Sequence, residues 1–209
     1  MHRMIRSDAP VRQARSPGRP REFDMDAALD GAVRIFRERG YHATSLADLG
    51  PAMGLTAGSI YKAFADKRAV FVAALDRYIR MRNSALQRLV DAQPTGHAKI
   101  RTVLHFYAES AHGIEGKRGC LVVGCATELS TFDAEIAQRV VTTLQNIETA
   151  LLGLVKLGQA DGSIAPALDP TACAGVLLSV VQGFRIMGKT GRSRARMTAA
   201  ADQALHLLD

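Results

Sequence analysis

The cysteine at position 120 is the reactive side chain whose surroundings can best be judged from the sequence. It follows Lys117 and Arg118 and opens a predicted helix over residues 120–130. Nearby cations and a helix N-terminus both stabilise a thiolate, so they lower the pKa of a thiol placed there. Because the thiolate is the form that is alkylated or oxidised, Cys120 is predicted to be an effector or redox sensor. The alternative is an inert cysteine that only packs.

The other cysteines and the histidines suggest no second site. Cys125 lies five residues further along the same helix and therefore points in another direction. Three cysteines are an odd number and form no C-x-x-C pair, which argues against a disulfide framework and a zinc site. His105 and His112 have no third ligand spaced to join them. No metal site and no cofactor are therefore predicted.

An enzyme that uses Cys120 as its nucleophile is the alternative from another class of protein. No His-Asp partners and no phosphate-binding glycine loop accompany this cysteine, so we predict that the chain is not an enzyme. Polar residues also interrupt otherwise apolar helices. These polar residues are Glu128, Gln145, Asn146 and Gln182. They either line an effector pocket or make hydrogen bonds in the core, and the pattern leaves both open.

The positive charge of the chain is concentrated near its N-terminus. Of a net charge of +7, the first 82 residues carry most, with 15 basic against 9 acidic side chains. Residues 1–22 are rich in arginine and proline and are predicted to be a flexible basic arm. Its Pro17–Arg21 segment is similar to strips that enter narrow minor grooves, and a disordered tail is the alternative. Such charge favours nucleic acid as a partner, and a sequence-indifferent DNA-coating protein is one candidate.

Composition and periodicity predict a soluble, all-helical protein. Hydrophobic residues make up 47% of the chain, aromatic residues 5%, and there is no Trp, which favours helix packing over a sheet core. No secretory signal and no stretch of about twenty apolar residues is found, so we expect a cytoplasmic protein without a membrane partner. About nine helices are predicted, with loops at 113–119 and 161–168. The helices span 24–39, 44–53, 57–64, 66–90, 97–112, 120–130, 133–159, 170–188 and 193–208.

The second and third of these helices are predicted to form a helix-turn-helix. Ser45 or Thr44 begins the first helix, with Asp48 as an acidic partner for the free N–H groups. Gly54 suits the left-handed turn between the two helices, and Thr56 begins the second. An ordinary helical hairpin would show the same pattern, so the pattern alone only weakly indicates DNA binding.

The segment from Phe23 to Phe71 holds a series of short motifs in a fixed order and spacing. They are Gly40-Tyr41, Thr44-Ser45-Leu46 with Asp48, Met53-Gly54-Leu55, Ser59-Ile60-Tyr61-Lys62-Ala63-Phe64 and Asp66-Lys67-Arg68. Through these motifs the segment resembles the TetR family of bacterial regulators. Gly50-Pro51 departs from the family by placing a helix breaker inside the first short helix.

The resemblance implies which residues contact DNA. The segment from Thr56 to Lys62 would enter the major groove, with Lys62 as the best candidate for reading guanine. Tyr61, Lys67 and the position of Thr44 match phosphate contacts of the family. Lys67 and Arg68 occupy the first turn of a helix, where a cation is unfavourable unless an outside anion sits there. The expected DNA-binding residues are Thr44, Ser45, Thr56, Ala57, Gly58, Ser59, Tyr61, Lys62 and Lys67.

The resemblance also implies how the chain is organised and what it does. Residues 23–68 would form the helix-turn-helix domain, and 69–209 the effector-binding and dimerisation domain. The last two helices would form the homodimer contact, with Cys173 packed there and a stripe running from Ala174 to Phe184. The expected function is a transcriptional repressor released from a palindromic double-stranded operator by a small molecule or an electrophile/redox signal. The block RGCLVVGCATELS is similar to one in a subgroup that responds to electrophiles.

Overall fold

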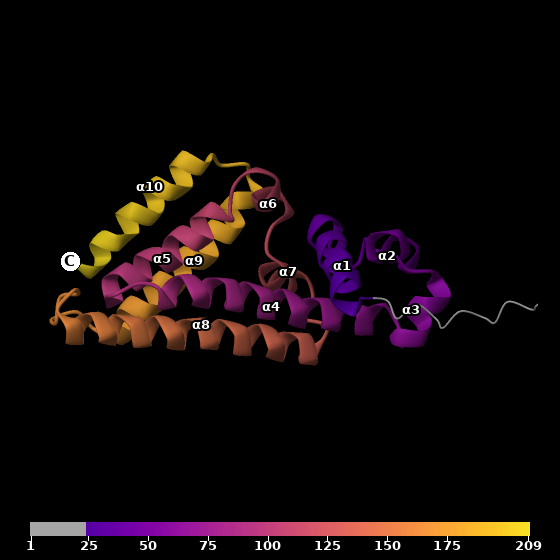
Figure 1. The fold of residues 1–209 in the computed structure, drawn as a ribbon, viewed down its shortest axis with the longest axis horizontal. Helices are drawn as coiled ribbons and strands as arrows, with labels where there is room; N and C mark the ends of the chain where they lie inside the picture. Colours follow the sequence, from indigo (N-terminus) through magenta and orange to yellow (C-terminus); the bar gives the residue numbers. More distant parts are fainter. Residues whose placement is uncertain (1–23) are drawn as a thin grey trace, which may run out of the picture.

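The described part of the chain is entirely helical. The computed structural model describes residues 24–209 and places ten α-helices and a short 3-10 helix in that range, with no strand among them (Figure 1). The all-helical fold class is therefore confirmed. Residues 1–23, where the basic arm is predicted, lie outside the described range. The elements are α1 (Met25–Arg39), α2 (Leu46–Met53), α3 (Ala57–Ala63), α4 (Lys67–Asp91), α5 (Gly96–Glu109), α6 (Gly113–Arg118), α7 (Leu121–Glu128), α8 (Ala134–Asp161), α9 (Pro170–Lys189), α10 (Arg194–Leu205) and η1 (His206–Leu208).

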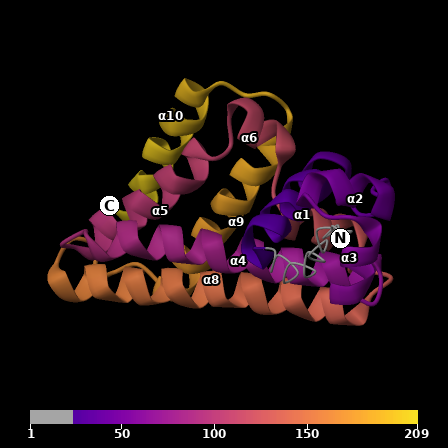
Figure 2. The same cartoon turned by 45° about the vertical axis from the view of Figure 1, so that its right-hand side comes forward.

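The helices form an elongated molecule with a small three-helix unit at one end. α1, α2 and α3 lie together at that end, and the C-terminus lies at the other (Figures 1 and 2). The two long helices α4 and α8 run roughly along the long axis in both views. α8 packs against α5 and α9, while α10 packs against α5. The small unit is therefore joined to the larger part mainly through α4.

The caps of the short helices explain where they begin and end. Ser45 and Asp48 form a capping box at the start of α2, in which each side chain accepts a hydrogen bond from the backbone N–H of the other. Gly54 adopts the left-handed conformation at φ 66°, which a glycine tolerates best, and ends α2. The Thr56 hydroxyl then accepts from the N–H of Ser59 and begins α3. These local signals produce the predicted helix-turn-helix.

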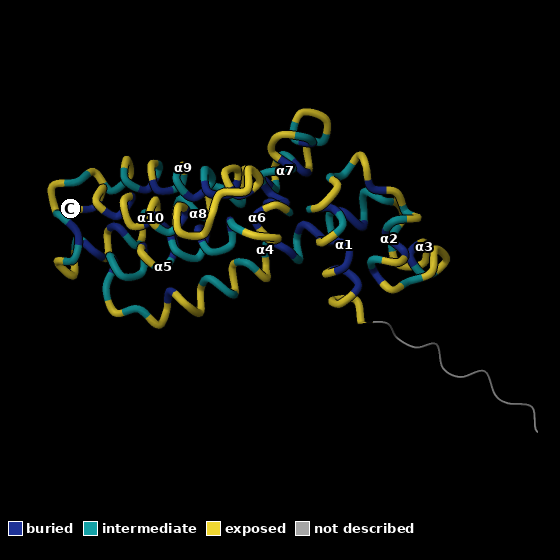
Figure 3. The backbone as a smooth tube through the Cα atoms, turned by 90° about the horizontal axis from the view of Figure 1, so that it is seen from above, coloured by how far each residue is buried: buried dark blue, intermediate teal, exposed yellow. Residues whose placement is uncertain are grey.

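Two clusters of buried apolar side chains stabilise the molecule, and α4 contributes to both. The first joins α1–α3 to the first half of α4, to α7 and to the start of α8. The second joins the end of α4 to α5, α8, α9 and α10. Figure 3 shows buried backbone continuing from one end to the other through these helices. The helix α1, on which α2 packs, therefore rests directly on α7, the helix that follows Cys120.

The helices α1 and α2 approach each other unusually closely at Gly31. An added Cβ at this position would lie 1.8 Å from the carbonyl oxygen of Ala52 and 3.1 Å from the Cα of Met53. No side chain fits in that space, so a glycine is required for the two backbones to meet. This contact sets the position of α2 on α1.

Two segments differ from the sequence-based expectations. The predicted loop at 113–119 contains the short helix α6, whose last residue, Arg118, is paired with Glu38 and Glu115. α9 is long and apolar enough to span a membrane by length and composition alone. Its apolar stripe, which includes Leu177 and Val181, is instead buried in the second core, and a buried arginine lies in the same helix.

Candidate nucleic-acid interface and sensor cysteine

The helix α3 presents its predicted DNA-contacting residues at the far end of the molecule from the C-terminus (Figure 1). Ile60 is buried and fixes α3 on the first core. Ser59 is half-buried, and its hydroxyl lies 3.0 Å from that of Thr56. The exposed side chains or backbone positions are Thr56, Ala57, Gly58, Tyr61 and Lys62. Small residues at its start leave the N-terminal turn of α3 open to close approach.

The two residues before α2 are used differently. Ser45 is exposed, and its hydroxyl donates to the Asp48 carboxylate at 2.6 Å. Thr44 is buried, and its hydroxyl donates to the carbonyl oxygen of Gly40 at 2.7 Å. The Thr44 side chain therefore holds the turn between α1 and α2 and does not face the surface.

The basic residues at the start of α4 have partners within the chain. The ammonium of Lys67 donates to the Tyr41 carbonyl at 3.1 Å and lies 4.3 Å from the centre of the Tyr41 ring. Arg68 binds both carboxylate oxygens of Asp133, at 2.6 and 2.9 Å, and also reaches Glu135. The sequence argument for an outside anion at this helix start is therefore wrong for Arg68, because the anions belong to α8.

Cys120 lies at the N-cap of α7, at the junction with α6. Burial alone would raise the pKa of its thiol. The charge of Arg185, the backbone N–H of Val123 and the hydroxyl of Tyr78 outweigh burial and lower the pKa below its ordinary value. The direction predicted from the sequence therefore agrees with the structure, but the cation was wrongly identified. Arg118 is bound to Glu38 and Glu115 instead.

The other two cysteines differ from Cys120. Burial, followed by the neighbouring Cys120, raises the pKa of the Cys125 thiol to about 12. Cys125 is also fully enclosed in the first core. Cys173 is half-buried against the second core. Of the three, Cys120 alone combines a lowered pKa with a place beside two cavities.

The segment around Cys120 is bonded directly to α1. The residue before the cysteine, Gly119, accepts a hydrogen bond from Arg37 Nε at 2.8 Å through its carbonyl. The same guanidinium binds Glu115 on α6 at 2.8 Å. At the end of α7, Glu128 accepts a bond from the backbone N–H of His42 at 3.2 Å. The α6–α7 junction is therefore bonded to α1, and the end of α7 is bonded to the turn that follows α1.

Sequence reasoning missed Arg185, Tyr78 and Arg37. Arg185 is 6% exposed and follows a run of apolar residues in α9. A lone arginine in an apolar helix is rarely buried without a role, so this signal was present in the sequence. Tyr78 and Arg37 could not be found, because each sits on an ordinary amphipathic helix.

The polar residues that interrupt apolar helices are divided among different cavities. Gln182 lines a cavity beside Cys120, and Asn146 lines a cavity between α4, α5 and α8. Glu128 lines a cavity at α1 and α7, whereas Gln145 is exposed on α8. They are not brought together in one site.

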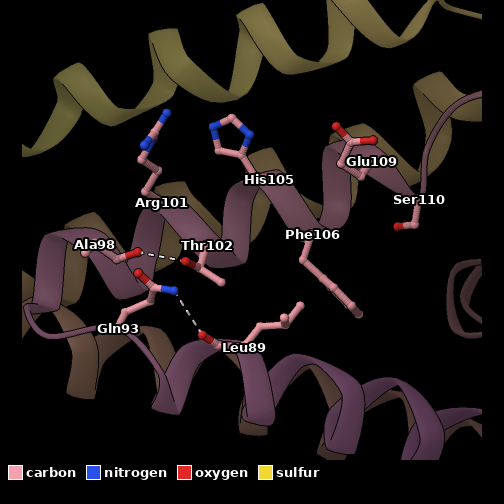
Figure 4. Close-up of a pocket in the computed structure, with 9 residues that line it drawn as sticks. All are labelled: Leu89, Gln93, Ala98, Arg101, Thr102, His105, Phe106, Glu109 and Ser110. Atoms are coloured by element: carbon pink, nitrogen blue, oxygen red, sulfur yellow. Dashed lines mark hydrogen bonds between the residues drawn. The ribbon is translucent and has the colours of Figure 1, made fainter.

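The described residues also line an open groove of about 710 Å³ between the end of α4 and α5. Figure 4 shows Leu89 and Phe106 between the two helices, with Arg101 and His105 turned toward α10. His105 lies 2.8 Å from a carboxylate oxygen of Asp202 on α10. Its side chain therefore helps to hold α10 on α5.

The expected dimer stripe on α9 is buried within the single chain. Ala174, Leu177, Val181 and Phe184 all belong to the second core. The prediction that this stripe contacts a second copy is therefore wrong, because the same helical spacing also describes an intramolecular core face. The exposed apolar residues of α9 lie on its other side: Val176, Ile186 and Met187.

Comparisons with known proteins agree with this geometry. Residues 28–74 match the family described as bacterial regulatory proteins, tetR family, and residues 96–204 match the tetracyclin repressor-like C-terminal domain. The HTH-type transcriptional repressor ComR of Escherichia coli (strain K12) is 33% identical over 92% of each chain. The HTH-type regulator YezE of Bacillus subtilis (strain 168) is 26% identical over 92% of this chain and 100% of its own. A cysteine variant of the TetR family regulator CifR, solved with 26-base-pair operator DNA, is 28% identical, with a TM-score of 0.81 over 91% of this chain and 100% of its own.

Proposed function

The chain belongs to the TetR family and is a DNA-binding transcriptional regulator, and we propose that it is a homodimeric repressor whose release from a palindromic operator is triggered at Cys120. TetR regulators are a non-enzymatic class, which favours this function over the cysteine enzyme. Residues 23–68 are assigned to DNA binding and 69–209 to signal binding and dimerisation. The observation that carries the proposal is the hydrogen bond from Arg37 on α1 to Gly119, the residue before Cys120.

We assign the operator contacts to α3 and the turns beside it. The open N-terminal turn, with Thr56, Ala57, Gly58 and Ser59, allows close approach to base edges and phosphates. Lys62 is the side chain assigned to guanine, and Tyr61 is assigned to a phosphate. The complex of CifR with operator DNA supports this use of the domain.

Three further residues would act on DNA less directly. Lys67 would reach a phosphate by leaving the Tyr41 carbonyl, and Ser45 would meet the backbone at the start of α2. Thr44 is buried, so its part in the interface is to hold the turn that presents Ser45.

The proposed dimer uses the exposed side of α9. Val176, Ile186 and Met187 are apolar side chains of α9 that stay exposed in the described chain. Covering this side of α9 with the same side of a second copy would give a two-fold arrangement, as a palindromic operator requires.

The proposed signal acts through the position of the α6–α7 junction. An adduct on the largely enclosed Cys120 thiol has to displace its neighbours, and Gly119 is bonded to α1 through Arg37. A shift of α1 moves α2 through their contact at Gly31. The two recognition helices would then no longer match successive major grooves, so the modified state has lower affinity for the operator.

Mass mapping combined with a gel shift tests the proposal. N-ethylmaleimide is titrated against the full chain on an operator found by footprinting upstream of its own gene. Cys120 should be alkylated before Cys125 and Cys173, and operator affinity should fall over the same range of reagent. Cys120→Ser should bind the operator and ignore the reagent, while Cys173→Ser should respond as the wild type does.

Either of two results rejects the sensor role. One is that Cys120 reacts no faster than the other two cysteines. The other is that the operator is released as readily from Cys120→Ser as from the wild type. A gel shift with random DNA as competitor separately excludes a sequence-indifferent coating protein if the operator complex survives.

A further inference from the structure

Two arginines beside Cys120 lie inside the protein without a carboxylate partner. The half-buried Arg82 on α4 and the buried Arg185 on α9 both donate to the hydroxyl of Ser110, at 3.0 and 3.3 Å. Neither takes part in any ion pair found among residues 24–209, whereas several other arginines of this range do. The Nε atom of each is buried with no hydrogen-bond acceptor.

Aromatic rings hold these guanidinium groups in place but do not neutralise them. Arg82 lies 4.3 Å from the centre of the Phe106 ring, and Arg185 lies 4.7 Å from that of Tyr107. Ser110 is neutral, and burial raises the pKa of the Tyr78 and Tyr107 phenols. The Cys120 thiol, whose pKa is lowered, is therefore the neighbouring group that most readily supplies a negative charge. Two enclosed cations and one potential anion leave a positive charge without a partner, which is unfavourable in a protein interior.

Two neighbouring cavities, one polar and one apolar, lie near the two arginines. The polar cavity, of about 30 Å³, is lined by Arg82, Arg185, Cys120 and Tyr78. The Tyr78 hydroxyl is buried and makes no hydrogen bond of ordinary geometry. A second cavity of about 180 Å³ shares part of the same wall. Its lining is largely apolar and includes Leu86, Val103, Ile147, Leu151 and Leu154.

We propose that a small monocarboxylic acid binds here, with its carboxylate between Arg82 and Arg185 and its apolar body in the cavity between α4, α5 and α8. Both unpartnered Nε atoms and the Tyr78 hydroxyl then gain an acceptor. A single negative charge matches the single unbalanced positive charge, and a carboxylate is the anion that a guanidinium fork binds best in such a small space. The second cavity holds about six water volumes at ~30 Å³ each, which suits a short alkyl or aryl chain.

The bound acid would also regulate Cys120, and this part rests on the proposed function. Its carboxylate forms an ion pair with Arg185, whose positive charge favours the Cys120 thiolate in the free protein. An occupied site therefore leaves the cysteine as a less reactive thiol. The reversible ligand and the electrophile would compete for the same arginine.

Calorimetry with hexanoate tests the site on the full chain without DNA. Hexanoate should bind the wild type and Cys120→Ser, whereas hexanamide, which has the same chain without the charge, should not. Arg82→Gln should weaken binding by about tenfold or more, since it removes one charge-assisted contact. Tyr78→Phe keeps the packed ring and should weaken binding by a smaller factor, which provides a test even if Arg82→Gln does not fold. Arg101→Gln, in the groove between α4 and α5, is the matched control and should leave binding unchanged.

Three results would overturn the proposal. They are equal binding of hexanamide, unchanged binding in both Arg82→Gln and Tyr78→Phe, and complete displacement of hexanoate by an equal concentration of chloride. Labelling with N-ethylmaleimide tests the regulatory part, because hexanoate should slow the labelling of Cys120 and not that of Cys173. Hexanoate binding to Cys120→Ser does not depend on the sensor role, so failure of the proposed function and failure of this site give different results.

Discussion

Replacing Gly31 by Ala should lower both the stability of the fold and the affinity for the operator. The new Cβ would lie 1.8 Å from the carbonyl oxygen of Ala52, whereas ordinary van der Waals contact begins at 3.4 Å. The helix α2 must therefore move by roughly 1.6 Å, because the obstacle is backbone and cannot rotate away. Helix propensity acts in the opposite direction and favours Ala over Gly by about 1 kcal/mol.

The clash should outweigh the gain in propensity. Overpacking of this kind costs roughly 1–3 kcal/mol and more when backbone is displaced. A net destabilisation of about 1–2 kcal/mol lowers the Tm by roughly 2–8 °C for a chain of this size. A hydrogen bond tolerates about 0.5 Å of variation, so moving α2 and α3 by more than that removes base contacts worth about 1–3 kcal/mol each. Operator affinity should therefore fall by at least about tenfold.

Gly153→Ala on α8 is the control for Gly31→Ala. Gly153 is exposed and a Cβ there meets nothing within 4 Å, so the change adds helix propensity without a clash. Thermal melts should show a higher Tm for Gly153→Ala and a lower one for Gly31→Ala. Fluorescence anisotropy should show unchanged operator affinity for the control alone. If Gly31→Ala melts with the wild type and binds the operator equally well, the argument from the α1–α2 contact is refuted.

Four further predictions concern other parts of the chain. Lys67→Ala should weaken binding to operator DNA and to random DNA alike. The slope of log K against log salt should shrink by about 0.9 for each phosphate that is no longer neutralised, and an unchanged slope would exclude a phosphate role for this lysine. Deleting residues 1–19 should lower affinity modestly and leave the preference for the palindrome intact, as measured by competition with unrelated DNA. Ile186→Arg should give monomers by light scattering, while Leu89→Arg, an equally exposed position on α4, should leave the dimer intact. Hydrogen bonds from Arg68 lower the pKa of Asp133 to about 2 from an ordinary 3.8. The stabilisation that ionised Asp133 gives the fold is therefore present above pH 3.8 and disappears as the pH falls toward 2. Over that range the free energy of unfolding, measured by denaturant titration, should fall more for the wild type than for Asp133→Asn.

The helix-turn-helix could be predicted from the sequence because its signals are local. A capping box, a left-handed glycine and a threonine cap each act within four residues, and all three occur at the predicted places. The exposed residues of α3 follow from the same local pattern. The Thr44 side chain could not be placed, because its burial depends on how α1 meets α2.

The surroundings of Cys120 could be predicted only in part, because they are assembled from distant segments. The sequence correctly pointed to a lowered pKa, but it assigned the effect to a neighbour in the chain. The cation that matters is Arg185, which lies on another helix 65 positions away. Arg68 shows the same limit, since its acidic partners lie on α8. Helical spacing likewise could not tell whether Phe184 faces its own core or a second copy.

The sharing of α4 between the two cores restricts how chimaeras of this protein can be built. A join at residue 68 would separate α1–α3 from Val70, Phe71, Ala74 and Leu75, which complete their core. It would also cut at the first turn of a helix that is about 37 Å long at 1.5 Å per residue. A recombinant that exchanges DNA specificity between relatives should therefore carry α1 to Tyr78 as one block, together with a matching α7. The DNA-binding and effector-binding parts of this fold can therefore be exchanged only at a junction that lies inside α4.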